Sequence, residues 1–230
     1  MEYFLSRTEA LIGKEAIQKL QQATVCVFGL GGVGSYVVEA LARSGIGSLV
    51  VVDSDVISLT NINRQLLADF TTIGRPKVEV CKERLLHINP NLQIRTYQEF
   101  YDESKSELIS SDFSYIVDAI DTVSSKLSII EEAQKKHIPL ISCMGTGNKL
   151  DPSKFEITDI SKTSVCPLAK VIRKECKRRN LSPVTVLYSR EEPVSTFAEE
   201  SCKKVPASIS FVPSVAGLML AGEVIRNLIS

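Results

Sequence analysis

The sequence predicts an α/β fold: a doubly wound, mostly parallel sheet of the Rossmann type, flanked by helices and followed by a C-terminal extension. Three observations support this expectation. Short apolar segments of strand length alternate with segments of helical spacing along the first 150 residues. Glycines cluster between the first strand and the first long helix, and acidic residues stand where the second and fourth strands end. A chain of 230 residues is also long enough to bury a sizeable core in one domain.

Residues 25–53 form one strand–turn–helix–strand unit, preceded by a helical lead-in over residues 6–22. Residues 25–28 are apolar or small and fit a buried strand, and residues 49–52 fit a second strand that ends on Asp53. A unit of this length makes one parallel crossover. The helix between the strands covers residues 33–43, and the turn before it holds Gly29, Gly31, Gly32 and Gly34.

The glycine turn and Asp53 together predict a nucleotide site. Phosphates can rest on backbone N–H groups where a helix begins, and side chains in the turn would hold them away. An acidic residue at the end of the second strand can accept hydrogen bonds from ribose hydroxyls, which is the role expected of Asp53. The alternative is a tight turn that needs glycine only for the shape of its backbone.

A polar loop leaves the same edge of the sheet, because residues 53–77 begin at the carboxyl end of the second strand. In an open parallel sheet, ligands bind beyond these strand ends. We therefore expect the polar side chains of this loop to surround the nucleotide. They are Asp55, Asn61, Asn63, Arg64, Gln65, Arg75 and Lys77.

The alternation of strands and helices continues beyond the loop. Helices are expected over residues 77–88, 104–109 and 126–137, and strands over residues 92–97, 115–120, 139–143 and 151–159. The fourth strand ends close to Asp121, on the edge that carries the glycine turn. A carboxylate there is well placed to hold Mg²⁺ against phosphates. The alternative role for Asp121 is the N-cap of the helix that follows.

A basic helix is expected after residue 159. Pro167 stands at its first position, and the helix carries the most basic surface of the chain. This surface is either a solvated helix face or a contact surface for RNA phosphates. Its basic residues are Lys170, Arg173, Lys174, Lys177, Arg178 and Arg179.

The last part of the chain predicts a strand over residues 184–188, a charged loop over residues 190–205 and a short extended piece over residues 206–212. An apolar helix over residues 215–229 is expected in the core or at a subunit interface. Three small residues would allow it to pack closely: Gly217, Ala221 and Gly222.

Composition excludes some classes of protein. Lys and Arg number 27, as do Asp and Glu, so a nucleic-acid partner would need a local basic patch. The sequence lacks an apolar run of membrane-span length, and its polar N-terminus lacks the apolar core of a signal peptide, so we expect a cytoplasmic protein. The six cysteines have no C-x-x-C spacing, which argues against a structural zinc site. Cys26 and Cys81 are expected in the core.

The motifs of the first 150 residues resemble those of the ubiquitin-activating-enzyme-like superfamily, which includes the ThiF-, MoeB- and HesA-like adenylating enzymes of thiamin and molybdopterin synthesis. The motifs are GLGGVG at 29–34, DSD at 53–55, TNINRQ at 60–65, RPK at 75–77 and DAID at 118–121. The resemblance implies one ATP-binding domain over residues 1–230. Its nucleotide-binding core would cover residues 1–150, and a substrate or dimer extension would cover residues 151–230.

The resemblance also implies roles for individual residues. Asp53 would hold the ribose, Asp121 would hold Mg²⁺, and Arg7 would reach the ATP of the partner subunit in a homodimer. ATP and Mg²⁺ are the implied cofactors, with a monovalent cation, K⁺ or Na⁺, as a further candidate. The implied catalytic residues are Arg64, Lys77, Asp121 and Arg7. The implied ATP-binding residues are Gly29, Gly31, Gly32, Gly34, Asp53, Asp55, Asn61, Arg64, Gln65, Lys77 and Asp121.

The second half of the chain narrows the resemblance. The run ITDISKT at 157–163, followed by PLAK at 167–170, resembles the branch that dehydrates threonylcarbamoyladenosine in tRNA, next to the anticodon. That branch implies activation of the threonine carboxylate by ATP and closure to a ring. Its longer members carry a cysteine just before the C-terminal apolar segment, where this chain has Pro206, so we assign no catalytic cysteine.

Three other interpretations stay open. A nicotinamide dehydrogenase would share the glycine turn and Asp53 but has no evident use for the polar loop. An adenylating enzyme for a ubiquitin-like sulfur-carrier protein would share every ATP residue and usually needs a thiol. Cys166 and Cys202 are candidates for that thiol, and Cys166 stands directly before a helix. A scaffold could bind ATP without turning it over.

Overall fold

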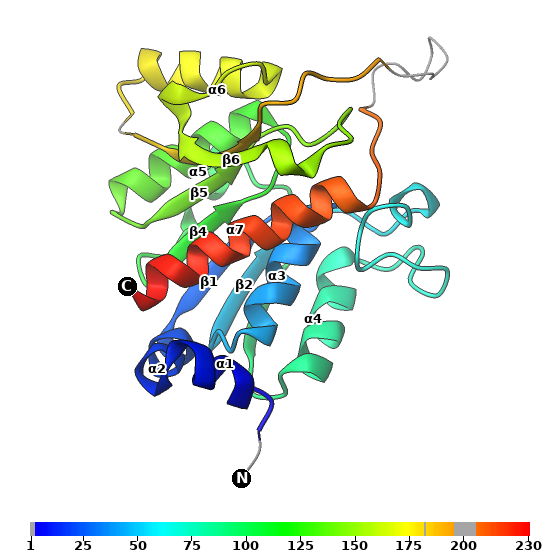
Figure 1. The fold of residues 1–230 in the computed structure, drawn as a ribbon, viewed down its shortest axis with the longest axis vertical. Helices are drawn as coiled ribbons and strands as arrows, with labels where there is room; N and C mark the ends of the chain where they lie inside the picture. Colours follow the sequence, from blue (N-terminus) through cyan, green and yellow to red (C-terminus); the bar gives the residue numbers. More distant parts are fainter. Residues whose placement is uncertain (1–2, 182, 196–205) are drawn as a thin grey trace.

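The computed structural model describes residues 3–181, 183–195 and 206–230, which form one seven-stranded sheet with helices on both faces (Figure 1). The strand order is β3-β2-β1-β4-β5-β7-β6, and in the described part only β6 runs antiparallel to its neighbour. The predicted doubly wound, mostly parallel sheet is confirmed. The strands are β1 Thr24–Phe28, β2 Ser48–Val52, β3 Gln93–Tyr97, β4 Tyr115–Asp118, β5 Leu140–Cys143, β6 Phe155–Asp159 and β7 Thr185–Ser189.

The helices agree with the local signals in the sequence at several ends. Helix α4 has the predicted bounds, since Pro76 precedes it and Asn89 ends it, and α6 begins at Pro167. The α-helices are α1 Ser6–Ile12, α2 Lys14–Gln22, α3 Gly34–Arg43, α4 Lys77–Ile88, α5 Val123–Lys135, α6 Pro167–Arg178 and α7 Phe211–Ile229. Short 3₁₀ helices cover η1 Leu59–Asn61, η2 Glu103–Leu108, η3 Pro152–Lys154 and η4 Ile160–Lys162.

Alternation along the central strand divides the core into layers. Val25 and Val27 point to the face that α3, α4 and α7 cover, whereas Cys26 and Phe28 point to the face that α5 covers. All four side chains are fully buried, because parallel strands in such a fold are covered on both sides. Cys81 of α4 is also fully buried, so the prediction that Cys26 and Cys81 belong to the core is confirmed.

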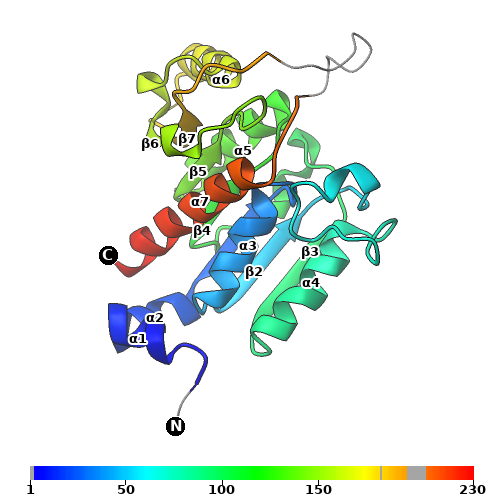
Figure 2. The same ribbon diagram turned by 45° about the vertical axis from the view of Figure 1, so that its right-hand side comes forward.

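The N-terminal helices lie at the amino ends of the strands, at the opposite end of the molecule from α6 (Figures 1 and 2). The single lead-in predicted over residues 6–22 is two helices, because Gly13 adopts a φ of +87° and breaks it. The end of α2 contacts the start of β2 closely, since a Cβ added at Gly47 would lie 1.7 Å from Gln21 O.

Four predicted elements have wrong boundaries. Helix α5 begins at Val123, after Thr122, and ends at Lys135, whereas the sequence predicts residues 126–137. Strand β4 ends at Asp118 and not at residue 120, because the Asp118 side chain accepts a hydrogen bond from Ile120 N at 3.1 Å and turns the chain. The edge strand β6 begins at Phe155, after η3, and not at residue 151. Helix α7 begins at Phe211, inside the predicted extended piece, because Pro213 stands in the first turn, where a helix needs no N–H donor.

Helix α7 packs closely on α3. A Cβ added at Gly217 would lie 2.4 Å from Val33 O, and Ala221 is fully buried, as predicted. Gly222 is half-buried, and a Cβ added there would meet Arg226 Nη1 of the same helix at 3.3 Å, so this glycine does not serve close packing on α3. In the described part of the chain, α7 is the one helix with the length and composition of a membrane span, so the prediction that no apolar run reaches that length is wrong for this helix. Its contacts with α2 and α3 are those of a helix in the core of the fold.

Candidate nucleotide site

A cleft of about 610 Å³ opens at the carboxyl ends of β1, β2, β4 and β5. This is the crevice where the strand order reverses beside β1, which is the usual ligand position in a doubly wound sheet. The C-terminal part of the chain adds Leu168, Pro206, Ser208 and Pro213 to its lining. The cleft brings together every residue of the implied ATP-binding set except Gly34: Gly29, Gly31, Gly32, Asp53, Asp55, Asn61, Arg64, Gln65, Lys77 and Asp121.

The glycines of the turn have different functions. A Cβ at Gly34 would lie 1.8 Å from Gly29 O, and a Cβ at Gly29, where φ is +88°, would lie 2.8 Å from Ala119 O. The backbone itself therefore requires glycine at both positions. A Cβ at Gly31 would meet no atom within 4 Å, although Gly31 lines the cleft. The backbone-shape explanation does not account for Gly31, whose open space at the start of α3 suits a phosphate.

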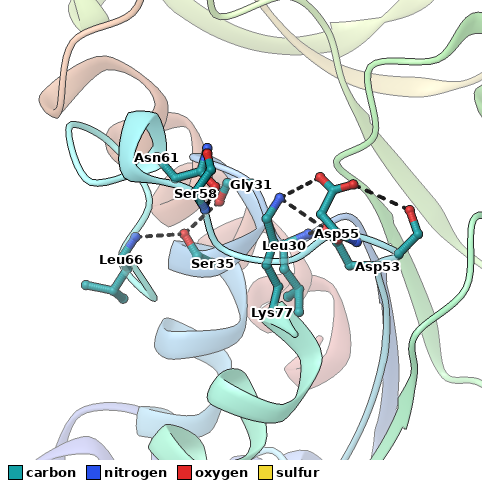
Figure 3. A network of polar contacts seen from close by, with 10 residues as sticks. Leu30, Gly31, Ser35, Asp53, Asp55, Ser58, Asn61, Leu66 and Lys77 are labelled. Atoms are coloured by element: carbon teal, nitrogen blue, oxygen red, sulfur yellow. Dashed lines mark hydrogen bonds and ion pairs between the residues drawn. The ribbon is translucent and has the colours of Figure 1, made fainter. Parts of the chain in front are cut away.

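Ser35, which is not among the residues predicted from the sequence, connects this turn to the polar loop. Its fully buried hydroxyl donates to Gly31 O at 2.7 Å and accepts from Leu66 N at 3.2 Å (Figure 3). The two segments that line the cleft are thus held to each other. A serine in the first turn after a glycine cluster is the signal that could have identified it.

Asp53 is fixed by backbone donors at the edge of the cleft. Its Oδ2 accepts from Leu30 N at 2.6 Å, and its Oδ1 accepts from Asp55 N at 2.8 Å. Burial raises the pKa of the Asp53 carboxyl, an effect that Lys77 and the two hydrogen bonds oppose. Each oxygen keeps a lone pair, so the side chain can still accept hydrogen bonds from ribose hydroxyls.

Lys77 is an almost fully buried ammonium at the start of α4. Figure 3 shows its side chain reaching toward Asp53 and Asp55. The Nζ atom lies 2.7 Å from Asp55 Oδ2 and 3.9 Å from Asp53 Oδ2, and Lys77 is 4% exposed. An ammonium has three donors, so Lys77 can bind an anionic ligand in the cleft while the carboxylates hold it in place.

Arg64 lies beside the glycine turn. Its Nη1 donates to Thr60 O at 3.0 Å and to Asn63 Oδ1 at 2.9 Å, and its Cγ would be 3.2 Å from a Cβ added at Gly32. All of these acceptors are neutral, so the positive charge of the guanidinium is not compensated by them. Arg64 is therefore available to an anion above the turn.

Asn61 and Gln65 occupy the same loop. Asn61 Oδ1 accepts from Ser58 N at 3.1 Å, which leaves its amide N–H groups for a ligand. Gln65 is 7% exposed, and its Oε1 has no hydrogen-bond partner among the described residues. A buried acceptor without a donor costs free energy, so Gln65 is a natural contact for a ligand hydroxyl or amine.

Asp121 lies on the exposed rim of the cleft, after a loop that a buried network holds. Asp118 and Lys126 are fully buried and form an ion pair of 2.8 Å, and Ser142 Oγ donates to Asp118 Oδ2 at 2.5 Å. Asp118 also holds Ile120, as described above. The sequence does not predict this network, because no local pattern marks Lys126 as buried.

Residues 206–208 cross the mouth of the cleft. On one side, Asn63 Nδ2 donates to Ser208 O at 3.0 Å. On the other side, Asn148 Oδ1 accepts from Ala207 N at 2.7 Å, and Asn148 N donates to Ala207 O at 2.8 Å. The C-terminal segment is therefore attached to the loop after β2 and to the turn after β5.

Two residues of interest lie outside the cleft of their own chain. Arg7 is exposed on α1, at the amino-terminal end of the sheet. Arg75 pairs with Glu83 on the surface at 2.5 Å. The structure thus gathers the other implied catalytic residues, Arg64, Lys77 and Asp121, but does not bring Arg7 to them within one chain.

The described cysteines offer no exposed thiol. Cys166 is 3% exposed, and a Cβ added at Gly145 would lie 3.6 Å from its Sγ. Cys143 lines the cleft, and burial raises its pKa to about 12. The reactive thiol that a sulfur-carrier enzyme usually needs is therefore not found at Cys166. Cys202, the other candidate, lies outside the described residues.

Asp121 offers one carboxylate at the rim of the cleft, which fits a Mg²⁺ ion that is bound mainly by phosphates. Among the described residues, no group of three or more His, Cys, Asp and Glu side chains could hold a metal ion. A cation at Asp121 would take its remaining ligands from phosphates and water, as Mg²⁺ commonly does.

Comparison with known proteins decides the family. The model of the ThiF family matches residues 5–230. The chain belongs to the ThiF family. This ThiF-family chain is 41% identical to the tRNA threonylcarbamoyladenosine dehydratase of Bacillus subtilis over 244 residues, covering 100% of the chain and 96% of that relative. It is 39% identical to the Escherichia coli enzyme of that name over 171 residues, covering 74% of the chain and 64% of that relative.

Solved structures and a more distant relative agree with this family. The E. coli dehydratase TcdA in complex with ATP superposes with a TM-score of 0.90 at 31% identity, covering 97% of this ThiF-family chain and 93% of that one. The complex of TcdA with AMP also gives a TM-score of 0.90. The molybdopterin-synthase adenylyltransferase of Salmonella typhimurium is 34% identical over 128 residues, covering 56% of the chain and 51% of that relative. The predicted resemblance to the superfamily and to its tRNA branch is confirmed.

Proposed function

We propose that this chain is an ATP-dependent adenylating enzyme that converts threonylcarbamoyladenosine in tRNA to its cyclic form. The observation that carries the proposal is the cleft, in which the open Gly31 position, Arg64, Lys77 and Asp121 meet at the carboxyl edge of the sheet. The full-length likeness to a dehydratase, and the ATP bound in the structure of TcdA, support the substrate and the nucleotide.

The chemistry requires ATP because a carboxylate is a poor electrophile. One oxygen of the threonine carboxylate attacks the α-phosphorus of ATP, the bond to the β-phosphate oxygen breaks, and pyrophosphate leaves. The carbonyl of the resulting acyl-adenylate can then be attacked by the carbamoyl oxygen or nitrogen. That attack closes the ring, releases a proton and expels AMP, which carries away the carboxylate oxygen.

Each residue of the cleft has a role in this scheme. Asp53 accepts hydrogen bonds from the ribose, and the open backbone at Gly31 receives phosphate. Arg64 and Lys77 offset the negative charge that gathers on the phosphates in the transition state. Asp121 would hold Mg²⁺, which supplies further positive charge against the phosphates. A monovalent cation stays a prediction without an assigned position.

We assign ATP binding to residues 1–150, and tRNA and subunit contacts to residues 151–230. Leu168 and Pro213 support a link between the two parts, because both line the cleft from the C-terminal side. A substrate of this kind also accords with a cytoplasmic location, where tRNA and ATP are available.

We also propose a homodimer in which Arg7 of each copy reaches the cleft of the other. Arg7 is exposed at the amino-terminal end of its own sheet, and its own cleft lies at the carboxyl end. Helix α7 supports association, because one side of it carries exposed or half-exposed apolar residues at helical spacing. They are Phe211, Val215, Leu218 and Ile225.

Mixing two inactive variants tests the shared site. Arg7→Ala and Lys77→Met proteins are each expected to lose turnover, and a mixture of exchanging subunits should regain roughly a quarter of the active sites. Each mixed dimer would hold one complete site. The absence of any recovery, with subunit exchange demonstrated, would contradict the contribution of Arg7 across the dimer.

Mass spectrometry of tRNA nucleosides tests the reaction. After incubation with ATP and tRNA that carries threonylcarbamoyladenosine, we expect the cyclic nucleoside, with stoichiometric AMP and pyrophosphate. A parallel reaction with ADP in place of ATP serves as the control. ATP binding without any change in the nucleoside would rule out the proposed reaction.

A second candidate function is adenylation of a ubiquitin-like or sulfur-transfer protein partner. The likeness to molybdopterin-synthase adenylyltransferase favours it, whereas the buried state of Cys166 weighs against it. ATP–pyrophosphate exchange separates the two functions. Exchange that depends on a small protein with a Gly-Gly tail, and not on tRNA, would favour the second.

A further inference from the structure

Helix α6 concentrates positive charge in a protein that has none overall. Residues 167–179 contain six basic side chains and one acidic one, a net charge of +5, whereas the whole chain is neutral. The helix lies on the outside of the molecule, beside α5 and at the end opposite α1 (Figures 1 and 2). A local patch of this kind is what a polyanionic partner requires of a neutral protein.

Ion pairs within the protein neutralise only part of the positive charge of α6. Arg178 pairs with Glu175, and Arg179 pairs with Glu131 at 2.7 Å, so both are compensated. Arg173 donates to Thr163 O and Oγ1, which are neutral acceptors. Three exposed lysines have no ion pair among the described residues: Lys170, Lys174 and Lys177.

These lysines share one face of the helix. Their spacing of four and three residues places them in a row, opposite the face that buries Ile172 and Cys176. A helix rises 1.5 Å per residue, so the row extends about 10 Å along the axis. Leu168 lines the cleft from the first turn of α6, so this end of the helix is the one next to the candidate active site. Lys170 stands in the same turn on another face, and Lys174 and Lys177 follow along the helix away from that end.

We propose that Lys170, Lys174 and Lys177 form a docking surface for the RNA backbone next to the nucleoside that enters the cleft. This inference rests on the proposed function and adds the position of the tRNA. Lysine ammonium groups on flexible stems suit phosphates as point charges, without reading bases. The surface would therefore hold the strand beside the modified adenosine, with a strong dependence on salt.

The test uses the full-length protein and a pair of variants matched in charge. Lys174→Ala/Lys177→Ala removes the two lysines farthest from the cleft, and Lys14→Ala/Lys82→Ala removes two exposed lysines from α2 and α4. Fluorescence anisotropy with a tRNA transcript measures Kd at several salt concentrations. Turnover measures KM for modified tRNA and for ATP.

We expect the α6 variant to bind tRNA about tenfold more weakly at low salt and to lower the slope of log Kd against log salt by about 1 to 2. KM for tRNA should rise, while KM for ATP and kcat at saturating tRNA stay unchanged. The Lys14/Lys82 variant should match the wild type. Equal weakening by both variants, or wild-type affinity in the α6 variant, would overturn the proposal.

The two proposals fail in distinguishable ways. If the wild type binds tRNA through α6 but forms no cyclic nucleoside, the reaction is wrong and the docking surface stands. If the wild type forms the cyclic nucleoside and the α6 variant keeps its tRNA affinity, the docking surface is wrong and the reaction stands. Weakened binding of a small acidic carrier protein, with unchanged tRNA binding, would assign the surface to that partner and overturn the RNA proposal.

Discussion

Two lysine–aspartate pairs in this protein have similar lengths and different surroundings. Lys126 and Asp118 are 2.8 Å apart, and both side chains are 0% exposed. Lys77 and Asp55 are 2.7 Å apart, but the Asp55 side chain is 63% exposed and lines the cleft. A sealed pair cannot lose one member without leaving a charge in a medium of low dielectric constant, whereas an open pair can accept a ligand. The first pair therefore holds the fold, and the second is available for chemistry.

The largest effect is expected from breaking the sealed pair. Lys126→Met should lower the free energy of unfolding by about 3–5 kcal/mol, because Asp118 is left buried without its partner. Urea denaturation measures the loss. The double variant Asp118→Leu/Lys126→Met should recover part of it, since it has no unpaired charge. A loss below about 1 kcal/mol in the single variant would show that the pair does not hold the fold.

Breaking the open pair, Lys77 and Asp55, should mainly change the rate of the reaction and have a smaller effect on the free energy of unfolding. Lys77→Met is expected to slow pyrophosphate release about 10²–10³-fold, because a donor to the phosphates is lost. Its free energy of unfolding should fall by less than that of Lys126→Met, since Asp55 is exposed to water and the nearly buried Asp53 is 3.9 Å away and keeps its two backbone donors. Lys82→Met, on the exposed side of the same helix, is the control. Wild-type pyrophosphate release from Lys77→Met would remove Lys77 from the reaction.

A smaller loss of rate is expected at the rim of the cleft. Asp121→Ala should slow pyrophosphate release at least about tenfold and raise the Mg²⁺ concentration needed for half-maximal rate. Because Asp121 is exposed, denaturation curves should be unchanged. A variant that releases pyrophosphate from ATP and modified tRNA at the wild-type rate would refute the magnesium role.

The smallest effect concerns the carboxylate beside the open pair. Burial raises the pKa of Asp53 above its ordinary value of 3.8, so the folded state holds its proton more tightly than the unfolded state. The free energy of unfolding therefore falls as pH rises from 3.8 to the raised pKa of the folded state. Above the raised pKa, the whole destabilising effect of the buried carboxylate is present. Relative to Asp53→Asn, the wild type should gain stability as pH falls toward 3.8.

Urea denaturation at a series of pH values measures this difference between wild type and Asp53→Asn. In a Lys77→Met background the window should move to higher pH, because Lys77 opposes the effect of burial on Asp53. A difference that does not change with pH would mean that Asp53 titrates alike in the folded and unfolded states.

Local patterns predicted those parts of the fold that depend on neighbours in sequence. Strand β1 follows from an apolar run before glycines, and α6 follows from a proline at its first position. Most of the cleft could be predicted for the same reason, since residues that follow parallel strands meet at one edge of the sheet. Gly31 is the clearest case, because its open space fits the predicted phosphate role.

The remaining features depend on contacts between distant segments. Lys126 lies in a helix and Ser142 in a strand, and only their meeting at Asp118 makes all three buried. Gly13 breaks the lead-in through a positive φ that neighbouring residues do not signal. Arg7 remains an expectation, since one chain cannot contain the contact that gives it a role.

Two asparagine side chains, Asn63 and Asn148, hold the segment at residues 206–208, and they should respond differently to replacement by aspartate. Ala207 and Ser208 take part through backbone atoms, so substitutions of their side chains leave these hydrogen bonds intact. Asn148 accepts through oxygen, so aspartate in its place keeps the acceptor and gains charge. Asn63 donates through nitrogen, so aspartate in its place would set a carboxylate against the Ser208 carbonyl. The same one-atom change would thus tighten one anchor of the cleft mouth and release the other.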